Sequence, residues 1–261
     1  MAHIHLTNVH VSFPLYELTG RSLKKRLMAS STGGRIGAEP TAKRTTIVQA
    51  LEDVTFNFEH GDRVALIGHN GAGKTTLLRV LAGIYEPALG QVNIAGQVAP
   101  LFDIGLGMEM EATGYDNILL RGLYLGLTKR EIKRQAHDIA EFTELGDFLN
   151  LPLRTYSLGM RMRLGFAVST AIQPDILLLD EGLSAGDAAF MAKANARLKE
   201  FWNKAAIIVL ASHSERLIRD MCEKAVLIEH GRVVASDTVD KVLAHYRHIR
   251  PVQSHEDTPV G

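Results

Sequence analysis

The sequence predicts an α/β protein in which helices cover a mostly parallel sheet and a glycine-rich loop binds phosphate. Three observations support this fold class. Residues 68–76 are glycine-rich and lie between a strand-like run and a helix-like run. The apolar run 176–179 is typical of a strand that is buried on both faces. From residue 187 onward, helix-like and strand-like segments alternate, as they do when helices join parallel strands.

The phosphate-binding prediction rests on residues 68–76, which read Gly-His-Asn-Gly-Ala-Gly-Lys-Thr-Thr. Two glycines with four residues between them precede Lys74 and Thr75, which is the spacing of a phosphate-binding loop. Glycines let successive backbone N–H groups point at one anion, and the following helix start adds partial positive charge. We expect Lys74 to reach the β- and γ-phosphates and Thr75 to contact Mg²⁺. These four fixed positions arise by chance in about one chain in a hundred, so we favour a nucleoside triphosphate site over an incidental glycine-rich turn.

Composition narrows the class of protein. A chain of 261 residues with 46% hydrophobic residues suits one α/β domain, or a core with a smaller subdomain. The 29 basic and 29 acidic residues balance, so the net charge gives no indication of a nucleic-acid partner. The single cysteine, Cys222, lies in an apolar-periodic run and predicts a buried thiol in a reducing compartment. No apolar run approaches the ~20 residues of a membrane span, and the start does not resemble a signal peptide, so we expect a cytosolic or peripheral protein.

The first part of the chain predicts strands that flank a polar insertion. Residues 4–11 alternate between apolar and polar side chains, as in a strand. Residues 20–46 break this pattern with many Ser, Thr and Gly residues, seven basic residues and one acidic residue. We favour a solvated loop with a short basic helix, and contact with anionic lipid headgroups is the alternative. Alternation resumes after residue 47 and predicts a half-buried strand that turns into strand 63–67.

The rest of the chain predicts a helical subdomain within the α/β core. A helix at 75–82 follows the glycine-rich loop, and two short strands follow it at 91–94 and 97–101. Helical periodicity from 115 to 149 and from 161 to 171 predicts a subdomain over about residues 107–171. The later elements are expected at 176–179 (strand), 187–204 (helix), 206–211 (strand), 215–221 (helix), 225–228 and 233–235 (strands) and 238–246 (helix), before a flexible tail at 251–261.

Three further features accompany the phosphate-binding loop. The apolar strand 176–179 ends at Asp180 and Glu181, which could hold Mg²⁺ and position water, although acidic pairs also begin helices. Ser157 precedes a helix and could form a second anion site there, or could act only as its N-cap. A lone histidine is usually structural, but the position of His213 after the next strand places it beside the same nucleotide.

These four features, in this order, resemble the nucleotide-binding subunit of an ABC transporter over about residues 4–246. Residues 68–75 resemble the Walker A loop, and residues 176–180 resemble Walker B, followed by Glu181 as the catalytic glutamate. Residues 157–160 and 184–187 resemble the signature loop and the D-loop, and His213 matches the switch histidine. The resemblance implies an ABC-type α/β core with an antiparallel β edge and an inserted helical subdomain.

The resemblance also implies a set of site residues. Lys74, Glu181 and His213 would be catalytic. ATP would contact Phe13 (with Tyr16 as the alternative), Gly68, His69, Asn70, Gly71, Ala72, Gly73, Lys74, Thr75, Thr76, Ser157 and Gly159. Mg²⁺ would contact Thr75, Asp103 and Asp180.

Finer details resemble the ATPases that export O-antigen, capsule or teichoic-acid polymers. The details are the sequences of residues 156–160, 101–107 and 186–190. Two positions depart from the pattern. The signature reads Ser-Leu-Gly at 157–159, where this subfamily usually has Ser-Ser-Gly. Asp103 stands where a glutamine usually contacts Mg²⁺, so a carboxylate would take that role.

The implied function is ATP hydrolysis that drives an integral membrane permease, which exports a polysaccharide such as lipid-linked O-antigen. Two copies would face head to tail at the cytoplasmic face of the inner membrane, with ATP between Lys74 of one copy and Ser157 of the other. The alternative is the ATPase of a lipid or drug exporter. A soluble ABC ATPase acting on DNA or ribosomes is disfavoured, because the chain has one cassette, one cysteine and no sustained heptads. The C-terminal segment 247–261 has only fifteen residues, whereas a glycan-binding β-sandwich needs roughly 100. We therefore expect no affinity for the exported glycan.

Overall fold

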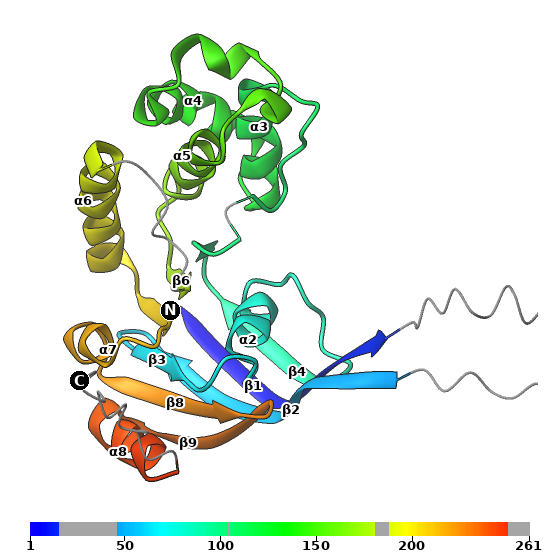
Figure 1. The fold of residues 1–261 in the computed structure, drawn as a ribbon, viewed down its shortest axis with the longest axis vertical. Coiled ribbons are helices and arrows are strands. Elements are labelled where there is room, and N and C mark those ends of the chain that lie inside the picture. The colour runs from blue at the N-terminus through cyan, green and yellow to red at the C-terminus, as the bar shows by residue number, and fades with distance from the viewer. Residues whose placement is uncertain (16–45, 104, 181–187, 250–261) are drawn as a thin grey trace, which may run out of the picture.

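A computed structural model describes residues 1–15, 46–103, 105–180 and 188–249 (Figure 1). The chain forms a sheet-containing lobe and a helical lobe, which is drawn at the top of Figure 1. The α/β fold class predicted from the sequence is confirmed. The polar insertion expected at 20–46 lies outside the described residues, apart from its last residue.

The central sheet has the strand order β5-β6-β7-β3-β8-β9. Its first five strands pair in parallel, and β9 pairs antiparallel with β8. The mostly parallel sheet expected from the alternation of helices and strands is therefore present. The strands are β3 (Arg63–Ile67), β5 (Val98–Pro100), β6 (Ile176–Asp180), β7 (Ile207–Ala211), β8 (Lys224–Glu229) and β9 (Arg232–Thr238).

A second, antiparallel sheet forms the β edge that the family resemblance implied. Its order is β2-β1-β4, with β1 spanning His3–Leu15, β2 Thr46–Glu59 and β4 Leu89–Ala95. β1 extends beyond the strand expected at 4–11, because its pairing with β2 continues to Leu15 opposite Thr46. Backbone hydrogen bonds hold this extension, and such bonds need no alternation of apolar side chains. The sequence pattern therefore ends before the strand does.

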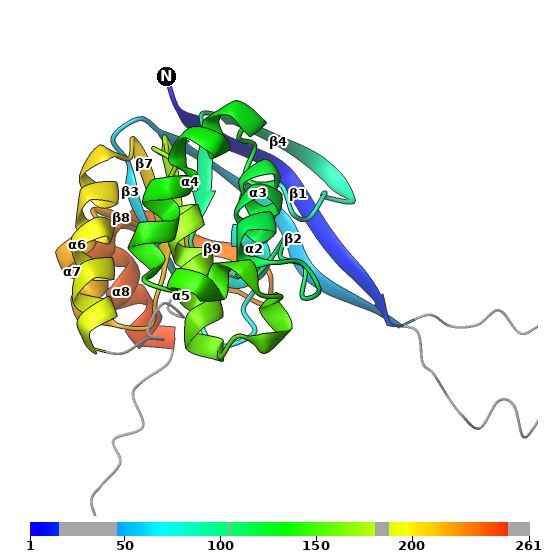
Figure 2. The ribbon, with the colours of Figure 1, turned by 90° about the horizontal axis from the view of Figure 1, so that it is seen from above.

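Each side of the central sheet has its own hydrophobic core. Alternate residues of β3 face the two cores, since successive side chains of a strand point to opposite faces. One core lies between this sheet, the antiparallel sheet and α2 (Lys74–Leu81). The other lies under α6 (Ala188–Lys204), α7 (Glu215–Met221) and α8 (Val239–Ile249), which Figure 2 shows on one side of the sheet. Burial on both sides explains why residues 176–179 are all apolar.

The helical lobe begins with two helices that have reciprocal N-terminal caps. Thr113 and Asp116 cap one helix, and Thr128 and Glu131 cap the other. In each pair the side chains satisfy backbone N–H groups that the helix itself leaves without partners. The elements of the lobe are α3 (Gly114–Tyr124), α4 (Lys129–Thr143), η1 (Gly146–Asn150), η2 (Leu153–Thr155) and α5 (Leu158–Ser169).

The helical lobe has a third core, and α6 connects this core to the central sheet. Phe190 and Ala194, near the start of α6, pack with residues of α3, α4 and α5. Phe201, near the end of α6, packs under the central sheet. One helix therefore belongs to two cores. The subdomain boundaries at about 107 and 171 stay a prediction.

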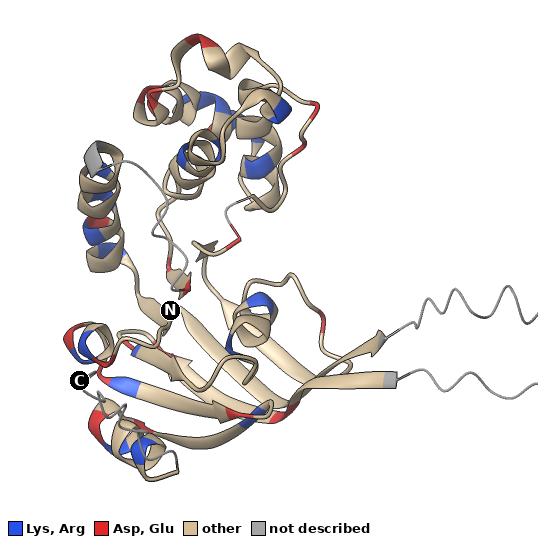
Figure 3. Ribbon diagram, viewed as in Figure 1, with Lys and Arg blue, Asp and Glu red and all other residues tan. Residues whose placement is uncertain are grey.

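Charged residues are distributed over both lobes. Figure 3 shows Lys and Arg interspersed with Asp and Glu along the helices of each lobe. Within the described ranges, no helix has the length and apolar character needed to cross a bilayer.

Asn117 offers a test of how the helical lobe is held together. This side chain is fully buried, donates to the carbonyls of Glu109 and Thr113 at 2.9 and 2.8 Å, and accepts from the N–H of Glu109 at 2.7 Å. Asn117→Ala would leave these groups unsatisfied and should lower the free energy of unfolding by about 3 kcal/mol, measured in urea. Asn203→Ala, at an exposed position of α6, is the control and should change it by less than about 0.5 kcal/mol.

Candidate functional site

The loop between β3 and α2 lies at the carboxyl end of the parallel strands. Gly68 has a φ of 153°, and a Cβ atom there would lie 2.3 Å from the carbonyl oxygen of Ile228 on β8. Only glycine fits this position, because the loop passes directly over a neighbouring strand. Gly73, with a φ of 112°, precedes α2 and supplies no side-chain cap. The first N–H groups of α2 are therefore available to an anion.

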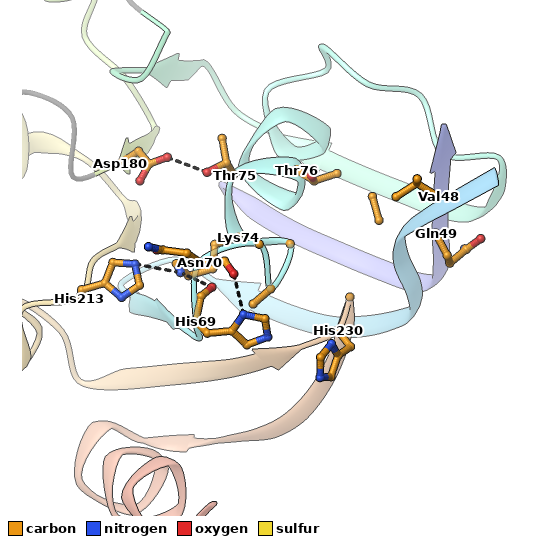
Figure 4. A pocket seen from close by; sticks show the side chains of 15 residues that line it. Val48, Gln49, His69, Asn70, Lys74, Thr75, Thr76, Asp180, His213 and His230 are labelled. Carbon is orange, nitrogen blue, oxygen red and sulfur yellow. Dashed lines mark hydrogen bonds between the residues drawn. The ribbon is translucent and has the colours of Figure 1, made fainter. Parts of the chain in front are cut away.

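Lys74 lies inside the curve of this loop and is 8% exposed. Its Nζ donates to the carbonyls of Gly68 at 2.6 Å and His69 at 3.1 Å, and lies 3.3 Å from Nε2 of His213 (Figure 4). An ammonium group can only donate, so Nε2 of His213 is the acceptor in this contact. The structure thus brings together two of the three residues expected to be catalytic.

Thr75 and Asp180 meet at the edge of the same pocket. The Thr75 hydroxyl donates to Oδ2 of Asp180 at 3.0 Å, although the two residues are 105 positions apart. Asp180 is the last residue of β6, and Thr75 is in the first turn of α2. Mg²⁺ prefers oxygen ligands and usually binds one or two carboxylates together with substrate phosphates and water. A hydroxyl and one carboxylate therefore fit this ion, and no group of three or more acidic, His or Cys side chains in the described ranges offers another metal site.

The pocket around the loop has a volume of about 520 Å³. Asp180 and His213 lie toward one end, and Val48 and Gln49 from β2 lie toward the other (Figure 4). His230, in the turn between β8 and β9, also lines the pocket, with its ring 5.1 Å from that of His69. The sequence reasoning missed the residues of β2 and of this turn.

The turn after β8 is hydrogen-bonded to the phosphate-binding loop. The N–H of Gly231 donates to the carbonyl of Ala72 at 2.9 Å, and the N–H of Glu52 donates to the carbonyl of Gly231 at 2.8 Å. Gly231 has a φ of 80°, and a Cβ atom there would lie 2.7 Å from the carbonyl of Ala50. A glycine at a hairpin turn was the available sequence signal, but it does not reveal which distant segments approach it.

Ser157 forms a second site in the helical lobe. It is the N-cap of α5, and its hydroxyl accepts from the N–H of Met160 at 3.2 Å. Ser157 and Gly159 line a separate pocket of about 370 Å³. None of the residues that line this pocket also lines the pocket around Lys74. In a single chain, the two expected ATP-contacting surfaces are therefore apart.

Two expected site residues have other contacts in this structure. Phe13 packs edge to face against Tyr85, with the ring centroids 5.1 Å apart, so its contact with adenine stays a prediction. Oδ2 of Asp103 accepts from Nε and Nη2 of Arg79 at 2.8 and 2.6 Å, so its contact with Mg²⁺ also stays a prediction. Glu181 and Tyr16 lie outside the described residues.

Cys222 lines neither of the two pockets described above. It is 7% exposed, and burial raises the pKa of its thiol to about 12. A thiol with so high a pKa holds almost no thiolate at neutral pH, and the thiolate is the nucleophilic form. The sequence prediction of a buried core thiol is confirmed.

The glycine loop, the enclosed lysine and the Thr–Asp pair at the edge of a parallel sheet define a nucleotide-binding protein of the P-loop class. Comparisons with known proteins narrow this class to one family. The profile of the family described as "ABC transporter" matches residues 51–184. The O-antigen export system ATP-binding protein RfbE of Yersinia enterocolitica is 46% identical over 233 residues, covering 89% of this chain and 97% of the relative.

Another relative supports this family, and a solved structure shares the fold. The O-antigen export system ATP-binding protein RfbB of Klebsiella pneumoniae is 35% identical, covering 94% of this chain and 97% of the relative. The dimeric post-hydrolysis structure of the ATP-binding cassette MJ0796, bound to ADP and Pi, has the same fold, with a TM-score of 0.62, 20% identity and coverage of 90% and 98%. The chain belongs to the ABC transporter family, as an ATP-binding subunit with an ATPase site, and groups with the polysaccharide export ATPases.

Lys74→Gln tests the role of the enclosed ammonium group. The amide can still donate hydrogen bonds but lacks the charge that attracts phosphate. Because a hydrogen bond to a charged group contributes about 1.5–3 kcal/mol, nucleotide affinity should fall by about tenfold or more. Titration with a fluorescent ATP analogue measures this. Lys241→Gln is the control, because Lys241 is 70% exposed and pairs with Asp237 on the surface. Equal affinities in the two variants would contradict the assignment.

Proposed function

We propose that this chain hydrolyses ATP to drive the export of a cell-surface polysaccharide. The observation that supports hydrolysis best is the contact between Thr75 and Asp180, which joins the two motifs that a Mg²⁺-dependent ATPase requires. Support for the exported substrate comes from relatives that are named as ATP-binding proteins of O-antigen and teichoic acid export systems. A lipid or drug exporter is the alternative, and no relative named here favours it.

The site residues would act mainly by positioning and electrostatics, as phosphoryl transfer demands. Lys74 and the N–H groups of the loop would hold the phosphates. Thr75 and Asp180 would hold Mg²⁺, which when bound neutralises negative charge on the phosphates. His213, already beside Lys74, would contact the γ-phosphate end. Glu181 would orient the attacking water.

A second copy of the chain would complete the site. Ser157 is at the start of α5 in the helical lobe, and its pocket is separate from the pocket around Lys74. A helix start with a serine hydroxyl is a suitable anion site. Head-to-tail pairing would place Ser157 and Gly159 of one copy opposite Lys74 of the other, so that both contact one ATP. The cassette structure of the same fold is dimeric, which supports the pairing of two copies.

The remaining partner would be an integral membrane permease. The chain would bind it at the cytoplasmic face of the inner membrane, and the polysaccharide would be handled by the permease. A deletion strain tests this function. Loss of the gene should leave lipid-linked polysaccharide inside the cell and none at the surface, and the intact gene, but not the Lys74→Gln gene, should restore export. Normal surface polysaccharide in the deletion strain, with a lipid or drug retained instead, would favour the alternative.

Glu181→Gln tests whether this residue orients water. The variant should bind MgATP normally, lose about 100-fold or more of its turnover, and accumulate as an ATP-bound dimer. If Glu181 only begins a helix, the change would cost about 1 kcal/mol of stability and leave hydrolysis near normal. Hydrolysis assays and size-exclusion chromatography distinguish the two. Glu200→Gln, at an exposed position of α6, is the matched control.

Asp103→Asn tests the proposed link between the metal site and the membrane partner. Asp103 precedes the glycine-containing loop at 105–107, which leads to the helical lobe. The variant should weaken permease-stimulated hydrolysis more than it weakens ATP binding. Both quantities are measured with the permease in vesicles, with Asp138→Asn at an exposed position of α4 as the control. Equal loss of both, or of neither, would count against a coupling role.

A further inference from the structure

Two histidines lie side by side on the flank of the phosphate-binding loop. His69 is in the loop itself, and His230 is in the turn between β8 and β9. Their ring centroids are 5.1 Å apart, and the ring planes are tilted by 60° (Figure 4). Both residues line the nucleotide pocket, yet neither imidazole ring has a part in the hydrolysis proposed above.

His69 has one ring nitrogen in a hydrogen bond and one without a partner. Its Nδ1 lies 2.6 Å from the carbonyl oxygen of Asn70. A carbonyl oxygen can only accept, so Nδ1 carries a proton and the neutral ring has its lone pair on Nε2. Among the described residues, no hydrogen-bond partner meets Nε2, although this atom is buried. A buried acceptor without a partner costs free energy, so a ligand that takes this lone pair would stabilise the arrangement.

The hydrogen bond of Nδ1 is the one that metal-binding histidines usually make. A histidine that binds a metal ion through one ring nitrogen commonly donates from the other to a backbone carbonyl, which fixes the tautomer and the orientation of the ring. Neutral imidazole suits Zn²⁺ and related transition-metal ions, whereas Mg²⁺ prefers oxygen ligands. The histidine pair therefore differs in chemistry from the pair of Thr75 and Asp180.

The backbone holds His230 in a fixed place beside the loop. Glu229 pairs with Arg232, so His230 and Gly231 are the two central residues of a hairpin turn. Their φ angles are 48° and 80°, as in a type I′ turn, where Asn followed by Gly is preferred. A histidine in the first of these positions is therefore a departure from the usual turn sequence. The hydrogen bond from Gly231 to Ala72 fixes the turn against the phosphate-binding loop.

We propose that His69 and His230 form a binding site for a divalent transition-metal ion, with Zn²⁺ as the best match. Nε2 of His69 and one ring nitrogen of His230 are the two protein ligands, and water takes the remaining positions. The bound ion joins the phosphate-binding loop to the turn between β8 and β9. This inference goes beyond the proposed function and does not depend on ATP hydrolysis, because the nucleotide-free chain contains both ligands.

Calorimetric titration of the purified, nucleotide-free full chain with zinc chloride tests the site. It is done at about pH 7.5, because metal binding requires the neutral imidazole. Loss of an outer partner of a metal-binding histidine already costs about 10- to 100-fold in metal affinity. His69→Gln and His230→Asn remove a ligand and should each weaken the tightest Zn²⁺ binding by at least about tenfold. Asparagine suits the first position of a type I′ turn, so His230→Asn keeps the turn.

Three controls accompany this titration. His60→Gln is the matched variant, because His60 is exposed in the turn between β2 and β3, and it should leave Zn²⁺ affinity unchanged. The double variant should lose no more than the larger single loss, because residues of one site are non-additive. Magnesium chloride in place of zinc chloride should give no binding that either histidine variant changes.

Two further measurements show whether the variants fold and whether the wild-type chain has the site. Thermal unfolding without metal reports the folding of each variant, and Zn²⁺ should raise the midpoint of the wild-type chain but of neither variant. Ring NMR signals of the wild-type histidines need no substitution, and one equivalent of Zn²⁺ should shift a single pair of them. Shifts of all the ring signals, or of none, would contradict the inference.

The outcomes separate this inference from the proposed function. Zn²⁺ affinities in His69→Gln and His230→Asn equal to that in His60→Gln would show that the two rings only pack together, and would overturn the inference. A loss in one of the two variants alone would also overturn it, because both ligands are needed. Absence of MgATP hydrolysis by the wild-type chain, measured without Zn²⁺, would overturn the proposed function instead.

Discussion

The structure of the site depends on one enclosed cation. The Lys74 ammonium group lies almost out of solvent, and the backbone carbonyls of Gly68 and His69 hold it inside the loop. This geometry requires the loop to curve tightly at the end of β3, which in turn requires glycine at position 68 beside the carbonyl of Ile228. Charged groups that are both buried and hydrogen-bonded are rigid, so the lysine and the loop position each other. The enclosed lysine therefore helps to fix the shape of the phosphate-binding loop.

The two lobes divide the chemistry between them. The sheet lobe holds the phosphate-binding loop and Asp180, whereas the helical lobe holds Ser157 at the start of α5. Among the described residues, the shared helix α6 connects the lobes, and so does the hydrogen bond between the N–H of Leu106 and the carbonyl of Asp103. The first connection is hydrophobic and extensive, and the second is polar and confined to a few groups.

Much of the fold could be predicted because its signals are local. The apolar strand β6, the loop at 68–76 and most helices after residue 187 were located to within a few residues. The capping pairs at Thr113 and Thr128 are a further local signal of helix starts, because a cap and its helix are adjacent in sequence. The extension of β1 was missed, because its partner strand β2 begins some thirty residues later and its stability comes from that pairing.

The sequence by itself determined the chemistry of the site, because glycine, lysine, threonine and carboxylate at fixed short spacings specify a phosphate-binding loop and a strand-end acid wherever the fold places them. Only the tertiary structure decided which distant groups meet. The contact of Thr75 with Asp180, the support of Ala72 by Gly231 and the pairing of Asp103 with Arg79 each join separate elements. Such contacts depend on the order of strands in the sheet and on the packing of one lobe against the other. No local spacing encodes that order, since it is the burial of all three cores together that selects it.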